Sequence, residues 1–122
     1  MRTLKKIIAA GVFILATAFQ VNAQQKQNNE PMKTYLIERE IPEAGNLTQD
    51  QLKEISQKSC SVLKEMDTNI EWLHSYVTDN KIYCVYKANN QGLIREHAEK
   101  GGFPVNSIQE LSVKIGPETA NN

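Results

Sequence analysis

The chain has 122 residues, with 14 basic and 14 acidic side chains, and the first 23 residues carry Arg2, Lys5 and Lys6 but no acid. The other 99 residues therefore have a net charge of about −3, and their scattered basic residues argue against binding to nucleic acid. Ordinary apolar, glycine and proline contents exclude a disordered or fibrous chain and predict one small domain with a single core.

The chain begins with a positively charged stretch, MRTLKK, and a continuous apolar run of 13 residues, IIAAGVFILATAF. The tripeptide VNA and a polar stretch follow, which is the pattern of a secretory signal peptide cleaved after Ala23. A transmembrane anchor needs about 20 apolar residues, and no cysteine follows the run for attachment of a lipid. We therefore expect a periplasmic or secreted product with no stable membrane anchor.

Residues 33–41 (KTYLIEREI) have the composition of a strand, which ends at Pro42. The carboxylates of this stretch, interleaved with Arg39, indicate a solvated strand end. Thr48 begins a helix, because Thr48 and Gln51 have the spacing of a capping box. One face of this helix is apolar, so the helix is expected to cover a sheet. That face consists of Leu52, Ile55, Ser59, Val62, Leu63 and Met66.

Two runs rich in aromatic and β-branched residues come next, IEWLHSYVT and KIYCVYKA, and a two-residue loop separates them. This loop, Asp79-Asn80, is typical of a β-hairpin because both residues tolerate positive φ. Asn89 or Asn90 then caps a short helix. Gly101-Gly102 ends that helix as a C-cap.

Residues 107–115 are predicted to form the last strand. The order βαββαβ predicts a ferredoxin-like α+β fold, an antiparallel sheet with two helices on one face. This domain occupies residues 33–115. Residues 24–32 are expected to form a flexible segment before it, and residues 116–122 a C-terminal tail.

Pairing Thr78 with Lys81 sets the register of the hairpin and assigns its side chains to two faces. The more apolar face, expected under the helices, carries Leu73, Val77, Ile82, Cys84 and Tyr86. The other face carries Trp72, His74, Tyr76, Tyr83 and Val85. The first and last strands are expected to add Leu36, Glu38, Glu40, Glu110, Ser112 and Lys114 to it. Because this uncovered face is too apolar for open water, we expect a homodimer packed sheet to sheet, a dimeric α/β barrel.

HSYVTDNKIYCVYKA, followed by IREHAEKGGFP, resembles the small ferredoxin-like proteins known as nickel-binding and catalogued as a domain of unknown function. YLIEREIPEAGNLT and QLKEISQKSCSVLKEM are similar to the same family, so the likeness covers about residues 33–115. The resemblance implies a ferredoxin-like dimer and binding of Ni²⁺, but no reaction. The signal peptide departs from the cytosolic form of the family and argues against an intracellular metal store.

His74 and His97 are the two histidines of the chain, and imidazole is a ligand that suits Ni²⁺. On the uncovered face, His74 lies near Glu38, and the pair could hold a metal. In the alternative of an isomerase- or oxygenase-type enzyme, His74 is the general base of a dimer cleft. Tyr76 or Tyr83 would then donate hydrogen bonds to a small organic substrate. A third interpretation is a histidine hydrogen-bonded within a dimer interface.

His97 lies on the second predicted helix, one turn before Gly101. It is either a further metal ligand or a partly buried histidine at a helix C-terminus, where the dipole favours positive charge. Cys84 faces the helices by register, and Cys60 flanks the apolar stripe of the first helix. The two cysteines are buried thiols, a disulfide permitted by export, or a thiolate pair that binds a soft metal.

The sequence therefore predicts an exported homodimer that binds a divalent transition metal, with nickel as the leading candidate, for sequestration or sensing. Its candidate ligands are His74, His97 and Glu38. The dimer-cleft enzyme and a non-catalytic interaction module are the alternatives.

Overall fold

The computed structural model describes residues 31–121, so the predicted signal peptide and its cleavage site lie outside the described residues. The order of strands and helices is β-α-β-β-α-β, which confirms the predicted ferredoxin-like α+β fold. Two short 3-10 helices, η1 and η2, complete it. The bounds are β1 Lys33–Glu40, η1 Ala44–Asn46, α2 Gln49–Met66, β2 Ile70–Val77, β3 Lys81–Ala88, α3 Gln91–Gly101, β4 Ser107–Leu111 and η2 Pro117–Asn121.

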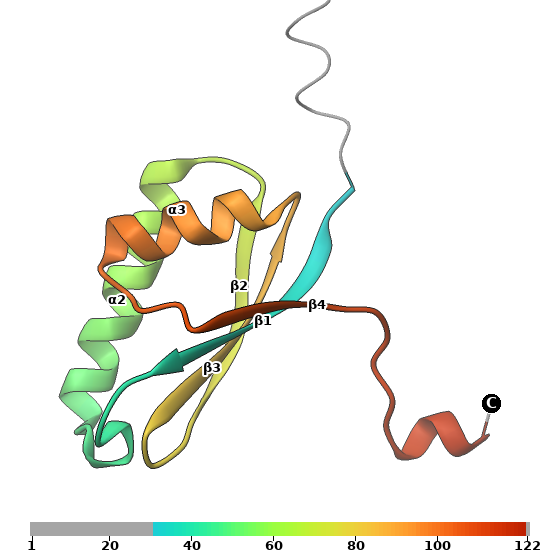
Figure 1. Cartoon of the computed structure of the whole chain (residues 1–122), viewed down its shortest axis with the longest axis horizontal. Coiled ribbons are helices and arrows are strands. Elements are labelled where there is room, and N and C mark those ends of the chain that lie inside the picture. The colour runs from blue at the N-terminus through green and yellow to red at the C-terminus, as the bar shows by residue number, and fades with distance from the viewer. Residues whose placement is uncertain (1–30, 122) are drawn as a thin grey trace, which may run out of the picture. The chain divides into compact units, whose positions relative to one another are not determined.

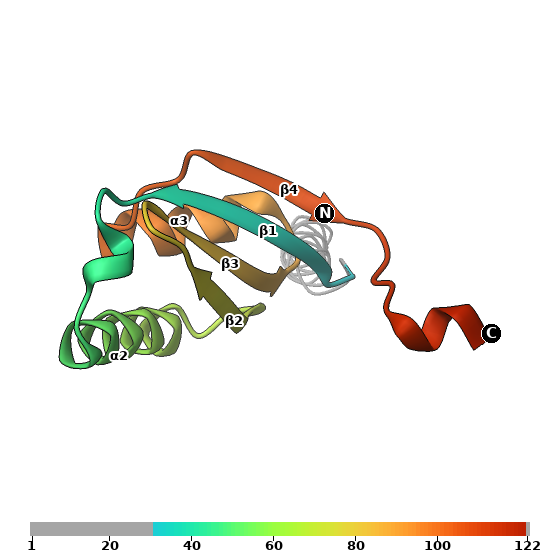
Figure 2. The same cartoon turned by 90° about the horizontal axis from the view of Figure 1, so that it is seen from below.

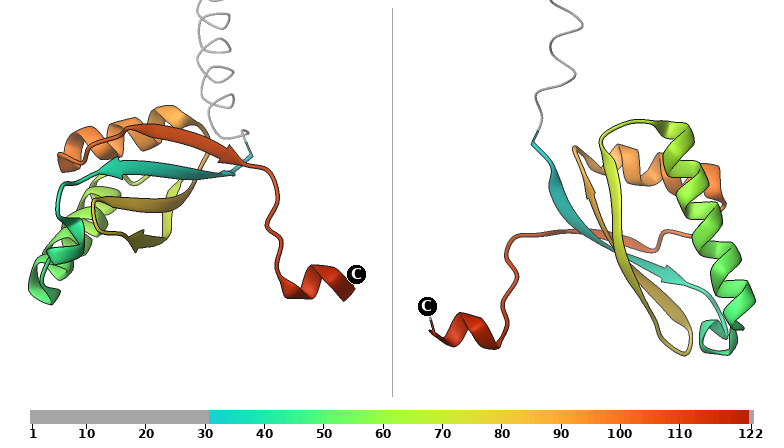
Figure 3. Two further views of the ribbon diagram at one scale, coloured as in Figure 1. Left: turned by 60° about the horizontal axis from the view of Figure 1, so that its bottom comes forward. Right: turned by 180° about the vertical axis from the view of Figure 1, so that it is seen from behind.

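The four strands form one antiparallel sheet in the order β2-β3-β1-β4. Helices α2 and α3 lie on the same face of this sheet (Figures 1 and 2), as predicted. We call that face the inner face and the opposite one the outer face. After β4 the chain leaves the sheet and ends in η2, inside the predicted C-terminal tail (Figure 3). Within residues 31–121, no helix has the length and hydropathy needed to cross a membrane.

Local signals explain where the helices and the hairpin begin and end. The capping box is formed, because the Gln51 amide donates to Thr48 Oγ1 at 3.2 Å and the Thr48 amide to Gln51 Oε1 at 2.9 Å. Asn90 caps α3 through its side chain, and Gly102, with φ of 72°, ends it. In the hairpin, the Thr78 amide donates to the Lys81 carbonyl at 2.8 Å, which confirms the predicted pairing of these two residues.

The core lies between the inner face and the two helices. Ile37 of β1 and Ile94 of α3 are completely buried there, and each anchors its element to the opposite layer. The predicted inward face of α2 is confirmed at Ser59 and Val62, its two buried residues. The buried cluster consists of Tyr35, Ile37, Ala44, Ile82, Cys84, Tyr86, Ala88 and Ile94.

A β-bulge in β2 corrects the predicted faces of Trp72 and Leu73. The predicted register holds from His74, which pairs with Val85, to the end of the strand. Between Trp72 and His74 the register shifts, so Trp72 pairs with Tyr86, a residue of the core. Residues directly opposite in an antiparallel pair share a face. Trp72 therefore lies on the inner face, and the extra residue, Leu73, lines a hollow on the outer face.

The last strand is shorter than predicted, and its register is offset by one residue. Leu111 pairs with Thr34 near the start of β1, so a strand that continued to residue 115 would have no partner. Ile108 pairs with the buried Ile37 and is the inward-facing residue. The outer-face positions of β4 are consequently Ser107, Gln109 and Leu111. The prediction that Glu110, Ser112 and Lys114 share the outer face of the strand is wrong.

Candidate functional site

No helix of residues 31–121 covers the outer face of the sheet, and this face carries most of the predicted site residues. Among its side chains, Tyr76 is 62 % exposed and Leu111 39 %. Large apolar groups thus remain in contact with solvent in the single chain. The outer-face residues of the three longer strands include Leu36, Glu38, Leu73, His74, Tyr76, Tyr83 and Val85.

His74 stands on the edge strand β2 and is exposed. Its ring packs edge-on against Tyr76, with the ring centroids 5.2 Å apart and an interplanar angle of 71°. Both rings line a hollow of about 490 Å³, whose other walls include Leu111 and Val113. The described residues that line this hollow include no carboxylate and no second imidazole. A single chain therefore offers one nitrogen ligand at this place.

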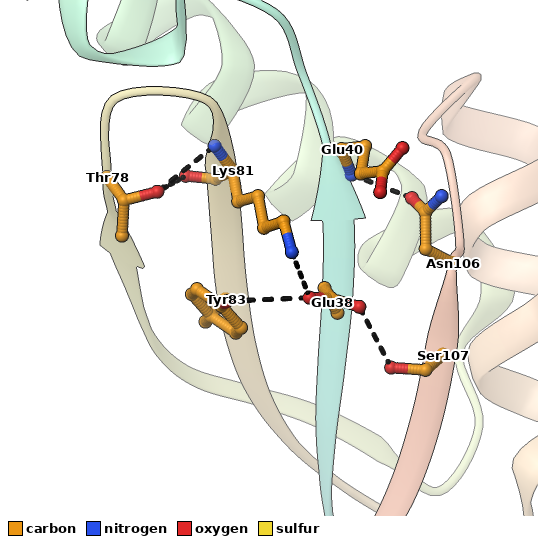
Figure 4. Close-up of polar contacts among 7 residues, drawn as sticks. All are labelled: Glu38, Glu40, Thr78, Lys81, Tyr83, Asn106 and Ser107. Atoms are coloured by element: carbon orange, nitrogen blue, oxygen red, sulfur yellow. Dashed lines mark hydrogen bonds and ion pairs between the residues drawn. The ribbon is translucent and has the colours of Figure 1, made fainter.

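Glu38 is held in a polar network on β1 (Figure 4). Lys81 Nζ donates to its Oε1 at 2.7 Å, and the Tyr83 hydroxyl approaches the same oxygen at 3.4 Å. Ser107 Oγ lies 3.5 Å from Oε2. The hydrogen bond from Lys81 lowers the pKa of Glu38, and burial opposes this effect only in part. The carboxylate is thus ionised at neutral pH, and its Oε1 already accepts a short charge-assisted hydrogen bond from Lys81.

The structure does not bring His74 and Glu38 together. Glu38 pairs with Tyr83, whereas His74 pairs with Val85, two residues farther along β3. Two strand spacings and two residues separate their Cα atoms, which gives roughly 12 Å. One metal ion bound by His74 would lie beyond the reach of Glu38 in the same chain.

His97 is completely buried between α3, α2 and the inner face. Its Nε2 lies 3.3 Å from Ser59 Oγ and 3.3 Å from the Ser59 carbonyl, while Nδ1 has no hydrogen-bond partner. The ring packs against Tyr86 and Phe103, at centroid distances of 5.2 and 5.6 Å. Burial lowers the pKa of His97, so the imidazole is neutral. The sheet separates His97 from His74, and the two cannot bind one ion in one chain.

The cysteines lie in different surroundings and are both free thiols in this structure. Cys84 is buried on the inner face, as its register predicts, whereas Cys60 on α2 is exposed. The disulfide, one of the three alternatives, is therefore not formed in this structure, and of the two thiols only that of Cys84 is buried. The outward position of Cys60 follows from its place beside, rather than within, the buried stripe of α2.

Arg39 on β1 is buried, which contradicts the predicted solvated strand end. It is only 3 % exposed, although its position among acidic residues suggested a solvated strand end. Its Nε donates to Cys84 Sγ at 3.4 Å and its Nη1 to the Pro104 carbonyl at 2.8 Å. Its guanidinium also lies 5.3 Å from the ring centre of Phe103. The period-two alternation with Tyr35 and Ile37 is the sequence signal that places it inside.

Within residues 31–121, no group of three or more His, Cys, Asp or Glu side chains could hold a metal ion. The described residues of one chain therefore do not make a complete metal site. Among the predicted ligands, the exposed imidazole of His74 is the side chain best suited to bind a transition metal, because nitrogen ligands suit Ni²⁺ and the neighbouring divalent metals.

Comparisons with known proteins identify one family. A sequence model described as "Nickel responsive protein SCO4226-like" matches residues 35–111, from β1 to the last residue of β4. A solved structure, described as "Crystal structure analysis of SCO4226 from Streptomyces coelicolor A3(2)", has a similar fold, with a TM-score of 0.59 and 19% identity. The match covers 67% of this chain and 99% of that one. No curated protein sequence matches the chain.

Proposed function

The chain belongs to the SCO4226-like family of nickel-responsive proteins, and on that premise we propose that it is an exported protein that binds Ni²⁺ between two copies of itself. The exposed imidazole of His74 on the uncovered outer face carries this proposal. Bound metal would serve sequestration or sensing outside the cytoplasm. The family description supports nickel as the metal, and the residues of the outer face suggest where it binds.

A homodimer accounts for the exposed apolar side chains of the outer face. Leu73, Tyr76 and Leu111 are each more than a third exposed in the single chain, at 38%, 62% and 39%. Two sheets pack face to face about 10 Å apart, a distance that side chains of this size fill. In a two-fold dimer the same patch serves both copies, so a residue near the axis meets its own counterpart.

His74 and the partner's His74 would supply two imidazole nitrogens to one ion across this interface. The second copy thus provides the nitrogen ligand that the hollow lacks in one chain. Glu38 could join this ion only from the other copy, and it would first have to release Lys81, which donates to it at 2.7 Å. His97 has no part in this site, because it is buried on the other side of the sheet.

Calorimetric titration with Ni²⁺, Zn²⁺, Cu²⁺ and Co²⁺ tests the proposal on protein expressed as the full chain and purified after export. We expect one Ni²⁺ per two chains. Loss of even an outer-shell partner of a metal site costs about 10–100-fold in affinity, so His74→Ala should lower the Ni²⁺ affinity at least about tenfold. Lys53→Ala changes an exposed residue of α2, which lies on the inner-face side of the sheet, so it is the control and should change nothing.

Light scattering of wild type and His74→Ala, each with and without Ni²⁺, measures whether the dimer forms independently of the metal. A dimer that persists without metal supports the packing argument. Equal Ni²⁺ affinity in wild type and His74→Ala would reject the assignment of His74. If none of the four metals binds and a small molecule copurifies in the hollow, the dimer-cleft enzyme with His74 as general base becomes the better hypothesis.

Export has its own test, because the predicted signal peptide does not depend on the metal. Cell fractionation should place the protein in the periplasm or the medium. Intact-mass measurement should give a chain that begins at Gln24. A cytoplasmic chain that retains residues 1–23 would contradict the prediction.

A further inference from the structure

The chain continues past β4 as a short arm, residues 112–116, which leads into η2. The ladder between β1 and β4 ends at Leu111, so the arm has no partner strand within residues 31–121. Val113 and Ile115 of the arm are 81 % and 74 % exposed, the highest fractions among the large hydrophobic side chains that the structure describes. Two β-branched side chains, which favour a strand, thus stand in solvent.

The arm has the alternating pattern of a strand that is covered on one side. Leu111, Val113 and Ile115 alternate with the polar residues Ser112 and Lys114. Leu111 is the outer-face residue at the end of β4, so the same alternation directs Val113 and Ile115 toward the side on which the outer face lies. A segment of this kind gains stability when another strand pairs with its backbone and an apolar surface covers its apolar side.

A hollow of about 490 Å³ lies between the arm and the outer face of its own chain. Leu73 and Tyr76 of the sheet line one side of it, and Leu111 and Val113 line the other. Figure 3 shows the chain turning away from the sheet after β4, so the arm does not pack on its own sheet. Whatever fills this hollow has to offer apolar surface to the sheet and to the arm at once.

The sheet has an edge that matches the arm. The strand β2 pairs with β3 on one side and with no strand of the described chain on the other, and most of its residues are exposed. The N–H and C=O groups along such an edge are free to pair with another strand. Leu73 and Tyr76 on this strand also face the hollow. The edge of β2 therefore joins free backbone groups to an apolar side, as the arm requires.

We propose that the arm of each copy pairs with the free edge of β2 in a second copy, so that the two sheets close into a barrel around their outer faces. This inference rests on the homodimer of the proposed function and adds the contacts that hold it together. A second copy fits both needs, because its outer face is apolar and its own β2 has a free edge. Under a two-fold axis each copy gives one arm and receives one, as in other cases of strand addition. Val113 and Ile115 then lie between the sheets and shield the proposed metal site from water.

Disulfide crosslinking in the full chain tests this exchange directly. Two preparations are mixed, both carrying Cys60→Ser, which removes the exposed native thiol. One carries Val113→Cys and a ¹⁵N label, and the other carries a single cysteine at each exposed position of β2 in turn. Residues opposite one another on paired strands have Cα atoms about 4.5–5.5 Å apart, within the range of a disulfide. At least one pair should give a covalent heterodimer, which its intact mass identifies.

Lys53→Cys replaces the β2 cysteine in the crosslinking control. It lies on an exposed position of α2, on the inner-face side of the sheet, and should give no covalent heterodimer with Val113→Cys.

Sedimentation of the full chain measures what the arm contributes to the dimer. Burial of one valine or isoleucine side chain changes an equilibrium constant by about tenfold or more, and the proposed dimer buries four of them. The double variant Val113→Asp, Ile115→Asp should therefore raise the dimer Kd at least about hundredfold. It should keep its fold, because the arm lies outside the buried cluster. The control Ala120→Asp, Asn121→Asp adds the same charge to exposed positions of η2 and should leave the Kd unchanged.

The outcomes distinguish this inference from the proposed function. If wild type is a dimer and the arm variant has the same Kd, or if no position of β2 crosslinks to Val113→Cys, the exchange is wrong and the homodimer stands. If wild type is a monomer with and without Ni²⁺, the homodimer and the exchange fail together. A covalent heterodimer and a weakened arm variant support the exchange whether or not His74→Ala loses Ni²⁺.

Discussion

Replacing Gly101 by alanine at the end of α3 should destabilise the protein, although alanine is the better helix former. A Cβ at this position would lie 2.3 Å from Phe103 Cε2 and 2.6 Å from Cδ2. The Phe103 ring would have to move, and it packs against His97 and under Arg39. Overpacking of this kind costs about 1–3 kcal/mol, and the severe overlap favours the upper half of that range.

The higher helix propensity of alanine relative to glycine offsets at most about 1 kcal/mol of this cost. The net loss in the free energy of unfolding is therefore about 1–2 kcal/mol. For a domain of this size, about 1 kcal/mol shifts the melting temperature by roughly 4–8 °C, so Gly101→Ala should lower it by roughly 4–16 °C. Urea denaturation followed by circular dichroism measures the free energy, and calorimetry measures the melting temperature.

Phe103→Leu provides the control for this reasoning, because it shortens the group that the new methyl meets. In the Phe103→Leu background, Gly101→Ala should cost less than about half of its cost in wild type. Gly92→Ala, in the same helix, places a Cβ near a single atom, Asn90 Oδ1 at 3.0 Å, and should have a smaller effect. A neutral or stabilising Gly101→Ala, or an equal cost in both backgrounds, would refute the argument from Phe103.

Three further predictions rest on single contacts. Thr48→Ala removes the capping box of α2 and should lower the free energy of unfolding by about 1 kcal/mol. Gln49→Ala, at the next residue, should leave it unchanged, and the urea midpoints of the two variants test the difference. Burial lowers the pKa of His97 below its ordinary value, so the unfolded chain binds the proton more readily and stability should fall as pH drops below about 6.5. This fall between pH 7.5 and 5.5 should be smaller in His97→Gln, and equal slopes would contradict it. Lys81→Met removes the hydrogen bond that lowers the pKa of Glu38, so NMR titration should find that pKa raised relative to wild type, and no change would contradict the network.

The ends of the helices and the tip of the hairpin were predictable from the sequence because each depends on residues a few positions apart. The capping box needs Thr48 and Gln51, and the hairpin needs a two-residue loop flanked by residues that pair. Alternation along β3 likewise places Cys84 and Tyr86 inside without any knowledge of the other strands.

The candidate site depended on contacts that no local pattern contains. The bulge in β2 exchanges the faces of Trp72 and Leu73, so a tryptophan that was expected on the outer face instead lies on the inner face. Glu38 and His74 share the outer face as predicted, but the pairing across three strands places them in different rows of the sheet, roughly 12 Å apart. Register between strands is set by the packing of both faces, and a shift by one residue moves a side chain to the other face.

The sequence by itself determined the order of the elements, the fold class and the family, because hydrophobic periodicity, caps and turns are local and the family motifs span most of the domain. Only the tertiary structure decided that Trp72 lies on the inner face and that His97 and Arg39 are buried. These properties arise when segments distant in the chain come together, since burial and electrostatic pairing belong to the packed layers rather than to any one segment.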